Sequence, residues 1–121
     1  MQPSGMIEPV LDERLLAELY GILGEDLRGI VQQLLDQLPE QCHALHGAVA
    51  GGELLQVKKL AHSIKGGAGN LGAVALSAAA ARLEMAAAGG DRAATGGLME
   101  AVDSLAHLTE AALQRFLDER R

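Results

Sequence analysis

The sequence has few aromatic residues, and this shortage argues against a nucleic-acid partner. Aromatic residues make up 2% of the 121 positions, with one Phe, one Tyr and no Trp. Proteins that bind single-stranded nucleic acid stack the bases on aromatic side chains, and their binding surfaces are basic. This chain instead carries a net charge of -6. We therefore expect no nucleic acid among its ligands.

Cysteine and long apolar runs are also scarce. The single cysteine, Cys42, cannot form an internal disulfide, which fits a reducing compartment. No run of about 18 apolar residues is present to span a membrane, and the N-terminus lacks the basic and apolar regions of a signal peptide. We expect a cytoplasmic protein without membrane contact, built as one domain over residues 8–121 after a flexible tail at residues 1–7.

The alternating pattern of β-strands is absent, and apolar residues recur at helical spacing instead. The spacing predicts five helices, at about residues 9–23, 25–51, 53–69, 70–89 and 91–118. Asp12 is the expected cap near the start of the first helix. We interpret the second as one long helix kinked at Pro39, with two shorter helices as the alternative. Leu108, Met85 and Met99 are expected in the core. Short connections favour antiparallel neighbours, so the expected fold class is an all-α, up-down helical bundle.

Acidic residues are missing from the middle of the chain, between Glu53 and Glu84. All three lysines lie in this interval, within four positions of His62: Lys58, Lys59 and Lys65. Successive helical residues turn by about 100°, which places His62 off the apolar face and in solvent, with the lysines as its surface neighbours. The arrangement predicts an anion site, and a phosphoryl group with roughly two negative charges is the leading candidate.

Glycines follow the histidine inside the predicted helix, beginning with Gly66. A glycine in a helix interior costs about 1 kcal/mol relative to alanine. A lone surface histidine near lysines is commonly incidental. The joint pattern of an exposed His, a Lys three residues later and a Gly four residues later favours a site that another protein approaches closely.

This segment closely resembles the central motif of the histidine-containing phosphotransfer (HPt) domain. It reads Ala61-His62-Ser63-Ile64-Lys65-Gly66-Gly67-Ala68-Gly69-Asn70-Leu71-Gly72-Ala73, followed by Leu76 and by Leu83-Glu84. The resemblance extends from about residue 10 to residue 117 and implies four packed helices with an N-terminal helix over one end. It implies that His62 accepts the phosphoryl group, that Lys65 steadies it, and that Gly66 leaves the ring accessible. Gly72 matches the glycine that lets the next helix pack closely.

Helical spacing adds Lys58, Lys59 and Gly69 to the residues expected to contact the phosphate or the partner, and the resemblance adds Glu84. Glu84 matches a position that is often Glu or Gln in the family. Its side chain either accepts a hydrogen bond from the imidazole or simply lies on the surface, and the sequence leaves both readings open. The family often has small hydroxyl residues where Gly67 and Ala68 stand here, so possible hydroxyl contacts to phosphate are absent.

The function implied by the resemblance is that of a monomeric phosphocarrier, not an enzyme, in a multistep phosphorelay. His62 is expected to carry a phosphoryl group reversibly between aspartates of response-regulator receiver domains, with a hybrid sensor histidine kinase upstream. No cofactor is expected, because the receiver supplies the Mg²⁺. Three alternatives stay open: an interaction module that binds a receiver or kinase without being phosphorylated, the phosphoacceptor region of a chemotaxis-type kinase, and a purely structural bundle.

Two other motifs are discounted. Residues 67–72 match the G-x-G-x-x-G pattern of dinucleotide-binding proteins, but no strand precedes them. His43 and His46, next to Cys42, have a spacing that occurs in metal sites. No second pair of ligands follows at a similar spacing, so we expect no metal site.

Overall fold

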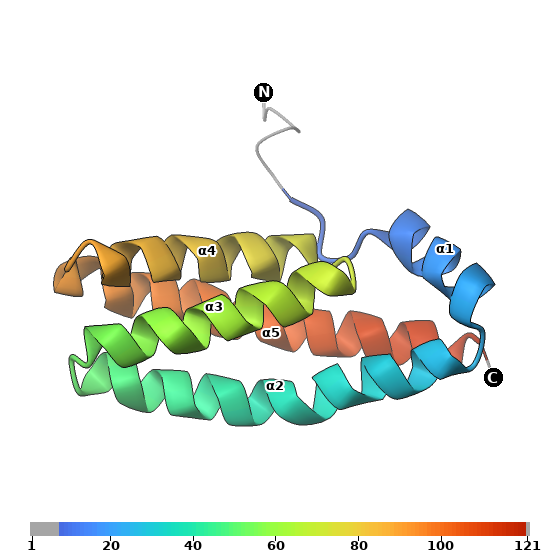
Figure 1. Cartoon of the computed structure of the whole chain (residues 1–121), viewed down its shortest axis with the longest axis horizontal. Helices are drawn as coiled ribbons and strands as arrows, with labels where there is room; N and C mark the ends of the chain where they lie inside the picture. Colours follow the sequence, from blue (N-terminus) through green and yellow to red (C-terminus); the bar gives the residue numbers. More distant parts are fainter. Residues whose placement is uncertain (1–7, 121) are drawn as a thin grey trace.

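The computed structural model describes residues 8–120, and all regular structure in this range is helical. The helices are α1 (Glu13–Leu23), α2 (Asp26–Ala50), α3 (Leu54–Asn70), α4 (Val74–Ala88) and α5 (Arg92–Asp118). Helices α2 to α5 run antiparallel, each packed on the next, and α5 closes the bundle against α2 (Figure 1). Helix α1 lies across one end of this bundle (Figure 1). The predicted all-α up-down bundle with an N-terminal helix is confirmed; the predicted tail at 1–7 lies outside the described residues.

The predicted cap of α1, Asp12, is confirmed, whereas the predicted start at about residue 9 is four residues too early. The helix begins at Glu13 because the Asp12 carboxylate accepts a hydrogen bond from the Leu15 backbone N–H at 3.1 Å and so caps its N-terminus. The preceding residues bond elsewhere: the Asp12 N–H donates to the Gly72 carbonyl at 2.7 Å, and the Pro9 carbonyl accepts from the Ala75 N–H at 3.0 Å. These bonds tie the N-terminal segment to the turn between α3 and α4 and to the first turn of α4.

The predicted start of α4 is also wrong. Asn70 is the last residue of α3, and the chain turns through Gly72, whose φ of 75° lies in the left-handed region, before α4 begins at Val74. Helix α3 therefore runs through the whole glycine cluster and ends one residue beyond its predicted end at about residue 69.

Helix α2 passes through Pro39 as one continuous helix of 25 residues, so the alternative of two shorter helices is wrong. Proline removes one helical hydrogen bond. Leu38 and Cys42, on either side of it, are both buried in the same core. Because apolar burial supplies most of the stability of a helix in a protein, α2 tolerates the missing bond.

The core between α3 and α4 is built largely from small side chains. Helix α4 buries the alanines at positions 75, 79, 80 and 87 along with Leu76 and Leu83. Alanine leaves little bulk between the helix backbones, so α3 approaches α4 closely. Among residues 8–120, no helix combines the length and apolar character needed to cross a bilayer.

Two residues expected in the core are exposed: Leu108 by 54% and Met85 by 73%, whereas Met99 is buried as predicted. Thr109 takes the buried position next to Leu108, and its hydroxyl donates to the Leu105 carbonyl at 2.7 Å. A polar residue can occupy the core stripe when its hydroxyl bonds the preceding helical turn. Met85 lies two residues after the buried Leu83 and is off the buried face of α4.

We predict that Gly72→Ala destabilises the fold by more than Gly90→Ala. Both glycines have left-handed φ angles, 75° and 76°, so each substitution carries a conformational cost of about 1–2 kcal/mol. A Cβ at Gly90 meets open space, but one at Gly72 lies 3.3 Å from Asp12 and from Leu15. Urea unfolding of both variants measures the difference; equal losses of stability would contradict tight packing at Gly72.

Candidate functional site

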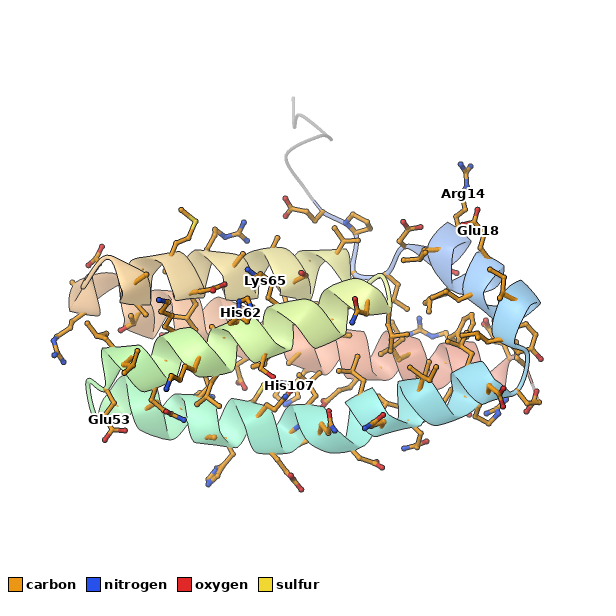
Figure 2. All side chains as sticks on the ribbon, viewed as in Figure 1. Arg14, Glu18, Glu53, His62, Lys65 and His107 are labelled. Atoms are coloured by element: carbon orange, nitrogen blue, oxygen red, sulfur yellow. The ribbon has the colours of Figure 1, made fainter. Side chains whose placement is uncertain are left out.

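His62 projects from the middle of α3 with its side chain 67% exposed, which confirms the solvent-facing position predicted for it. Its neighbours Ala61 and Ile64 are buried in the core and fix the rotation of the helix. Figure 2 shows His62 and Lys65 on the edge of α3 that faces α4, far from Arg14 and Glu18 on α1.

One carboxylate from α4 contacts both residues. Glu84 Oε2 lies 2.9 Å from Nδ1 of His62, and Glu84 Oε1 lies 2.8 Å from Nζ of Lys65. The Glu84 side chain is only 17% exposed, and the fully buried Leu83 next to it anchors this part of α4. Of the two sequence interpretations of Glu84, the geometry matches the hydrogen bond to the imidazole.

The charge state of Glu84 determines which imidazole nitrogen carries the proton. The hydrogen bond from Lys65 is the main cause that holds the pKa of Glu84 below its ordinary value of 4.5; the bond to His62 adds to it, and partial burial opposes both. Glu84 is therefore ionised at neutral pH and can only accept hydrogen bonds. Nδ1 of His62 must donate, so in the neutral ring Nε2 has a free lone pair.

Nε2 is the ring nitrogen that remains accessible. Among residues 8–120, no group forms a hydrogen bond with it. A depression of about 350 Å³ adjoins the ring and is lined by Lys58, Lys59, His62 and Glu84. The structure thus gathers these predicted residues around the imidazole.

The two glycines predicted for the site differ in their surroundings. A Cβ added at Gly66 has no other atom within 4 Å, so no contact inside the molecule requires glycine there. A Cβ at Gly69 would lie 3.2 Å from the Ser77 hydroxyl. Gly69 therefore has a packing role that the sequence did not indicate.

Two polar contacts beside His62 were not predicted. The Ser77 hydroxyl of α4 donates to the Lys65 carbonyl at 3.0 Å and supports the glycine-rich part of α3. On the other side, the Gln41 amide of α2 donates to the Ser63 hydroxyl at 3.2 Å. Both link residues that are distant in the sequence, and only knowledge of the helix packing could have found them.

The other three histidines lie together in a second groove, of about 270 Å³, between α2 and α5. Its lining includes His43, His46, His107, Asp103 and Glu110, and His46 Nε2 lies 3.2 Å from Asp103 Oδ1. In the view of Figure 2, His107 lies on the α2 side of α3, whereas His62 and Lys65 lie on its α4 side. Within residues 8–120, no group of three or more His, Cys, Asp or Glu side chains is placed to hold a metal ion.

Cys42 borders the same groove, but its thiol is expected to be unreactive. Burial, helped by the negative charges of Asp103 and Glu110, raises the pKa of its thiol to about 11. Because the thiolate is the reactive form of cysteine, Cys42 is not expected to act as a nucleophile at neutral pH.

Comparisons with known proteins give the same picture. The family model described as Hpt domain matches residues 29–119. Among solved structures, the crystal structure of histidine-containing phosphotransfer protein B (HptB) from Pseudomonas aeruginosa PAO1 superimposes with a TM-score of 0.88 at 26% sequence identity. The match covers 93% of this chain and 98% of that one. A search of curated proteins found no significant match.

We predict that the stabilising contribution of Glu84 disappears in acid. A group whose pKa is lowered in the folded state stabilises the fold above its ordinary pKa of 4.5, and the contribution is lost as the pH falls through the lowered value. At about pH 7, Glu84→Gln should cost less than about 1 kcal/mol, and near about pH 2 the two proteins should be equally stable. Urea unfolding at both pH values measures this, with the exposed Glu100→Gln as control. A difference that persists unchanged in acid would contradict it.

Proposed function

The chain belongs to the Hpt domain family, and we propose that it carries a phosphoryl group on His62 between aspartates of receiver domains in a multistep phosphorelay. One observation supports His62 above all: an exposed imidazole whose Nδ1 is bonded to Glu84 and whose Nε2 faces solvent, at the position of the family motif. Within residues 8–120, the other three histidines lie in the separate groove between α2 and α5.

The proposed reaction is an in-line transfer at phosphorus. The lone pair on Nε2 of His62 attacks the phosphoryl group of an aspartyl phosphate on the receiver. A new N–P bond forms, the O–P bond breaks, and the receiver's aspartate leaves as a carboxylate. The Nδ1 proton stays on the ring against Glu84, so no proton has to leave for the bond to form. The reverse sequence delivers the phosphoryl group to a second receiver.

The lysines position the phosphoryl group rather than drive the chemistry. Lys65 is one turn from His62, and Lys58 and Lys59 line the depression beside the ring. Each exposed contact of this kind is worth about 0.3–1 kcal/mol. Together they orient the anion, and most of the rate acceleration is left to the receiver.

We assign the Mg²⁺ of the reaction to the receiver. Glu84 is the carboxylate that lines the depression, and its two oxygens already face His62 and Lys65. That donor set does not suit Mg²⁺, which prefers several oxygen ligands. The protein is in this proposal a phosphocarrier without a cofactor of its own, acting as a monomer in the cytoplasm.

The proposed docking surface is the exposed face of α3. It includes Lys58, His62, Lys65, Gly66 and Gly69. A hybrid sensor histidine kinase is the proposed source of the phosphate, through its receiver domain. The open space at Gly66 supports this surface, because a helical glycine that no internal contact requires permits close approach by another backbone.

We predict that His62→Gln abolishes phosphorylation and leaves the bundle folded. The side chain is largely exposed, so its replacement leaves no cavity. Transfer from a phosphorylated receiver should give an acid-labile, base-stable label on the wild type alone. His107→Gln, in the opposite groove, is the matched control and should be labelled normally. Label retained in His62→Gln would contradict the assignment of His62 as the phosphoacceptor. Receivers that bind but give no label on the wild type would identify a noncatalytic interaction module.

We predict that Gly66→Leu slows transfer from a receiver by at least about tenfold, because the larger side chain hinders the close approach of the receiver to His62. A tenfold slowing corresponds to about 1.4 kcal/mol of lost transition-state contact. Phosphorylation by phosphoramidate, a small donor, should change little because its approach needs less room. Gly97→Leu is the matched control: Gly97 is a helical, exposed glycine of α5 that also has open space around it. Equal effects of Gly66→Leu on both donors would remove Gly66 from the docking surface.

A further inference from the structure

Glu84 is the charged group closest to His62 that has the same sign as a phosphoryl group. The resemblance to the HPt domain suggested that Glu84 contacts the phosphate or the partner. Its carboxylate faces the ring nitrogen at 2.9 Å and the Lys65 ammonium at 2.8 Å. The carboxylate and the phosphoryl group repel each other, so direct phosphate binding by Glu84 is excluded on charge.

The contact to Nδ1 affects how easily the phosphoryl group leaves. When a phosphoryl group departs from Nε2, a ring that keeps its Nδ1 proton leaves as neutral imidazole. A ring without that proton has to leave as an imidazolide anion, which is a much poorer leaving group. Because the Glu84 carboxylate holds the Nδ1 proton, it favours the reactive form of the phosphorylated ring.

The contact to Lys65 acts in the same direction. The ammonium is needed by two anions once His62 is phosphorylated: the Glu84 carboxylate, which it already contacts, and the new phosphoryl group. Any share of Lys65 that stays with Glu84 is not available to stabilise the phosphohistidine. The other cations facing the ring from α3, Lys58 and Lys59, make no contact with Glu84 among the bonds and ion pairs of the described residues.

We propose that Glu84 is a positioning residue that sets the lifetime of the phosphohistidine, keeping it short by holding the Nδ1 proton and by competing for Lys65. This inference rests on the proposed function. It assigns a carboxylate of α4 to the donation step, in which the N–P bond breaks, the phosphoryl group passes to a carboxylate of the acceptor or to water, and neutral imidazole is left.

The test compares Glu84→Gln with the wild type after phosphorylation by phosphoramidate, whose N–P bond breaks as ammonia leaves. Glutamine keeps the size of the side chain and a hydrogen-bond acceptor but removes the charge. The phosphohistidine of Glu84→Gln should decay about three- to tenfold more slowly at neutral pH, and its transfer to a receiver should slow by a similar factor. Glu100→Gln, at an exposed position of α5, should match the wild type.

The pH profile and a double variant separate positioning from structure. The decay of the phosphohistidine slows as the pH rises and Nδ1 loses its proton. Between about pH 6 and pH 9, this slowing should occur at a lower pH in Glu84→Gln than in the wild type, because the Nδ1 proton of the variant is held less firmly. In a Lys65→Met background the effect of Glu84→Gln should shrink, since one of its two routes is gone. Circular dichroism checks that each variant is folded.

Equal lifetimes and superimposable pH profiles for wild type and Glu84→Gln would overturn the inference and leave the proposed function intact. A faster decay in Glu84→Gln would overturn it as well. Failure of the wild type itself to accept a phosphoryl group on His62, from phosphoramidate and from receivers alike, would refute the proposed function and this inference together.

Discussion

The close packing of α3 against α4 is the constraint on which the site depends. Alanines on α4 and the missing side chain at Gly69 let the two helices approach, and Ser77 then reaches the Lys65 carbonyl. This approach brings Glu84 within hydrogen-bond distance of both His62 and Lys65. Looser packing would leave an exposed imidazole with no group to fix its tautomer, and a lysine free to pair elsewhere.

The charge pattern of the site follows from the same packing. The segment that forms α3 and most of α4 has no acidic residue of its own, so the lysines around His62 face a single carboxylate supplied by Glu84. That carboxylate neutralises part of the positive charge and holds the ring proton, while the face toward solvent remains basic. A site of this kind suits a group that must be accepted and released again: weak exposed contacts orient the anion, and no deep cavity retains it.

Much of this arrangement could be predicted from the sequence because it depends on local spacing. The periodicity of apolar residues predicted the five helices. The rotation of about 100° per helical residue predicted that His62 lies in solvent next to the lysines. Contacts between helices could not be predicted in this way. Glu84 lies 22 residues from His62, and its bond to the ring depends on the register of α4 against α3. The predicted starts of α1 and α4 were each about four residues too early. Both lie where the Asp12 N–H donates to the Gly72 carbonyl, a contact between residues that are also distant in sequence. Leu108 and Met85 were wrongly predicted to lie in the core, because apolar character alone does not decide which of two neighbouring helix positions is buried.

The measurement that tests the central claim most directly is the two-bond ¹H–¹⁵N NMR spectrum of the His62 ring, recorded before and after phosphorylation by phosphoramidate. The account predicts that at neutral pH the resting neutral ring carries its proton on Nδ1, held by Glu84, and that the phosphorus appears on Nε2. A resting ring protonated on Nε2, or a phosphoryl group on Nδ1 or on another residue, would contradict it.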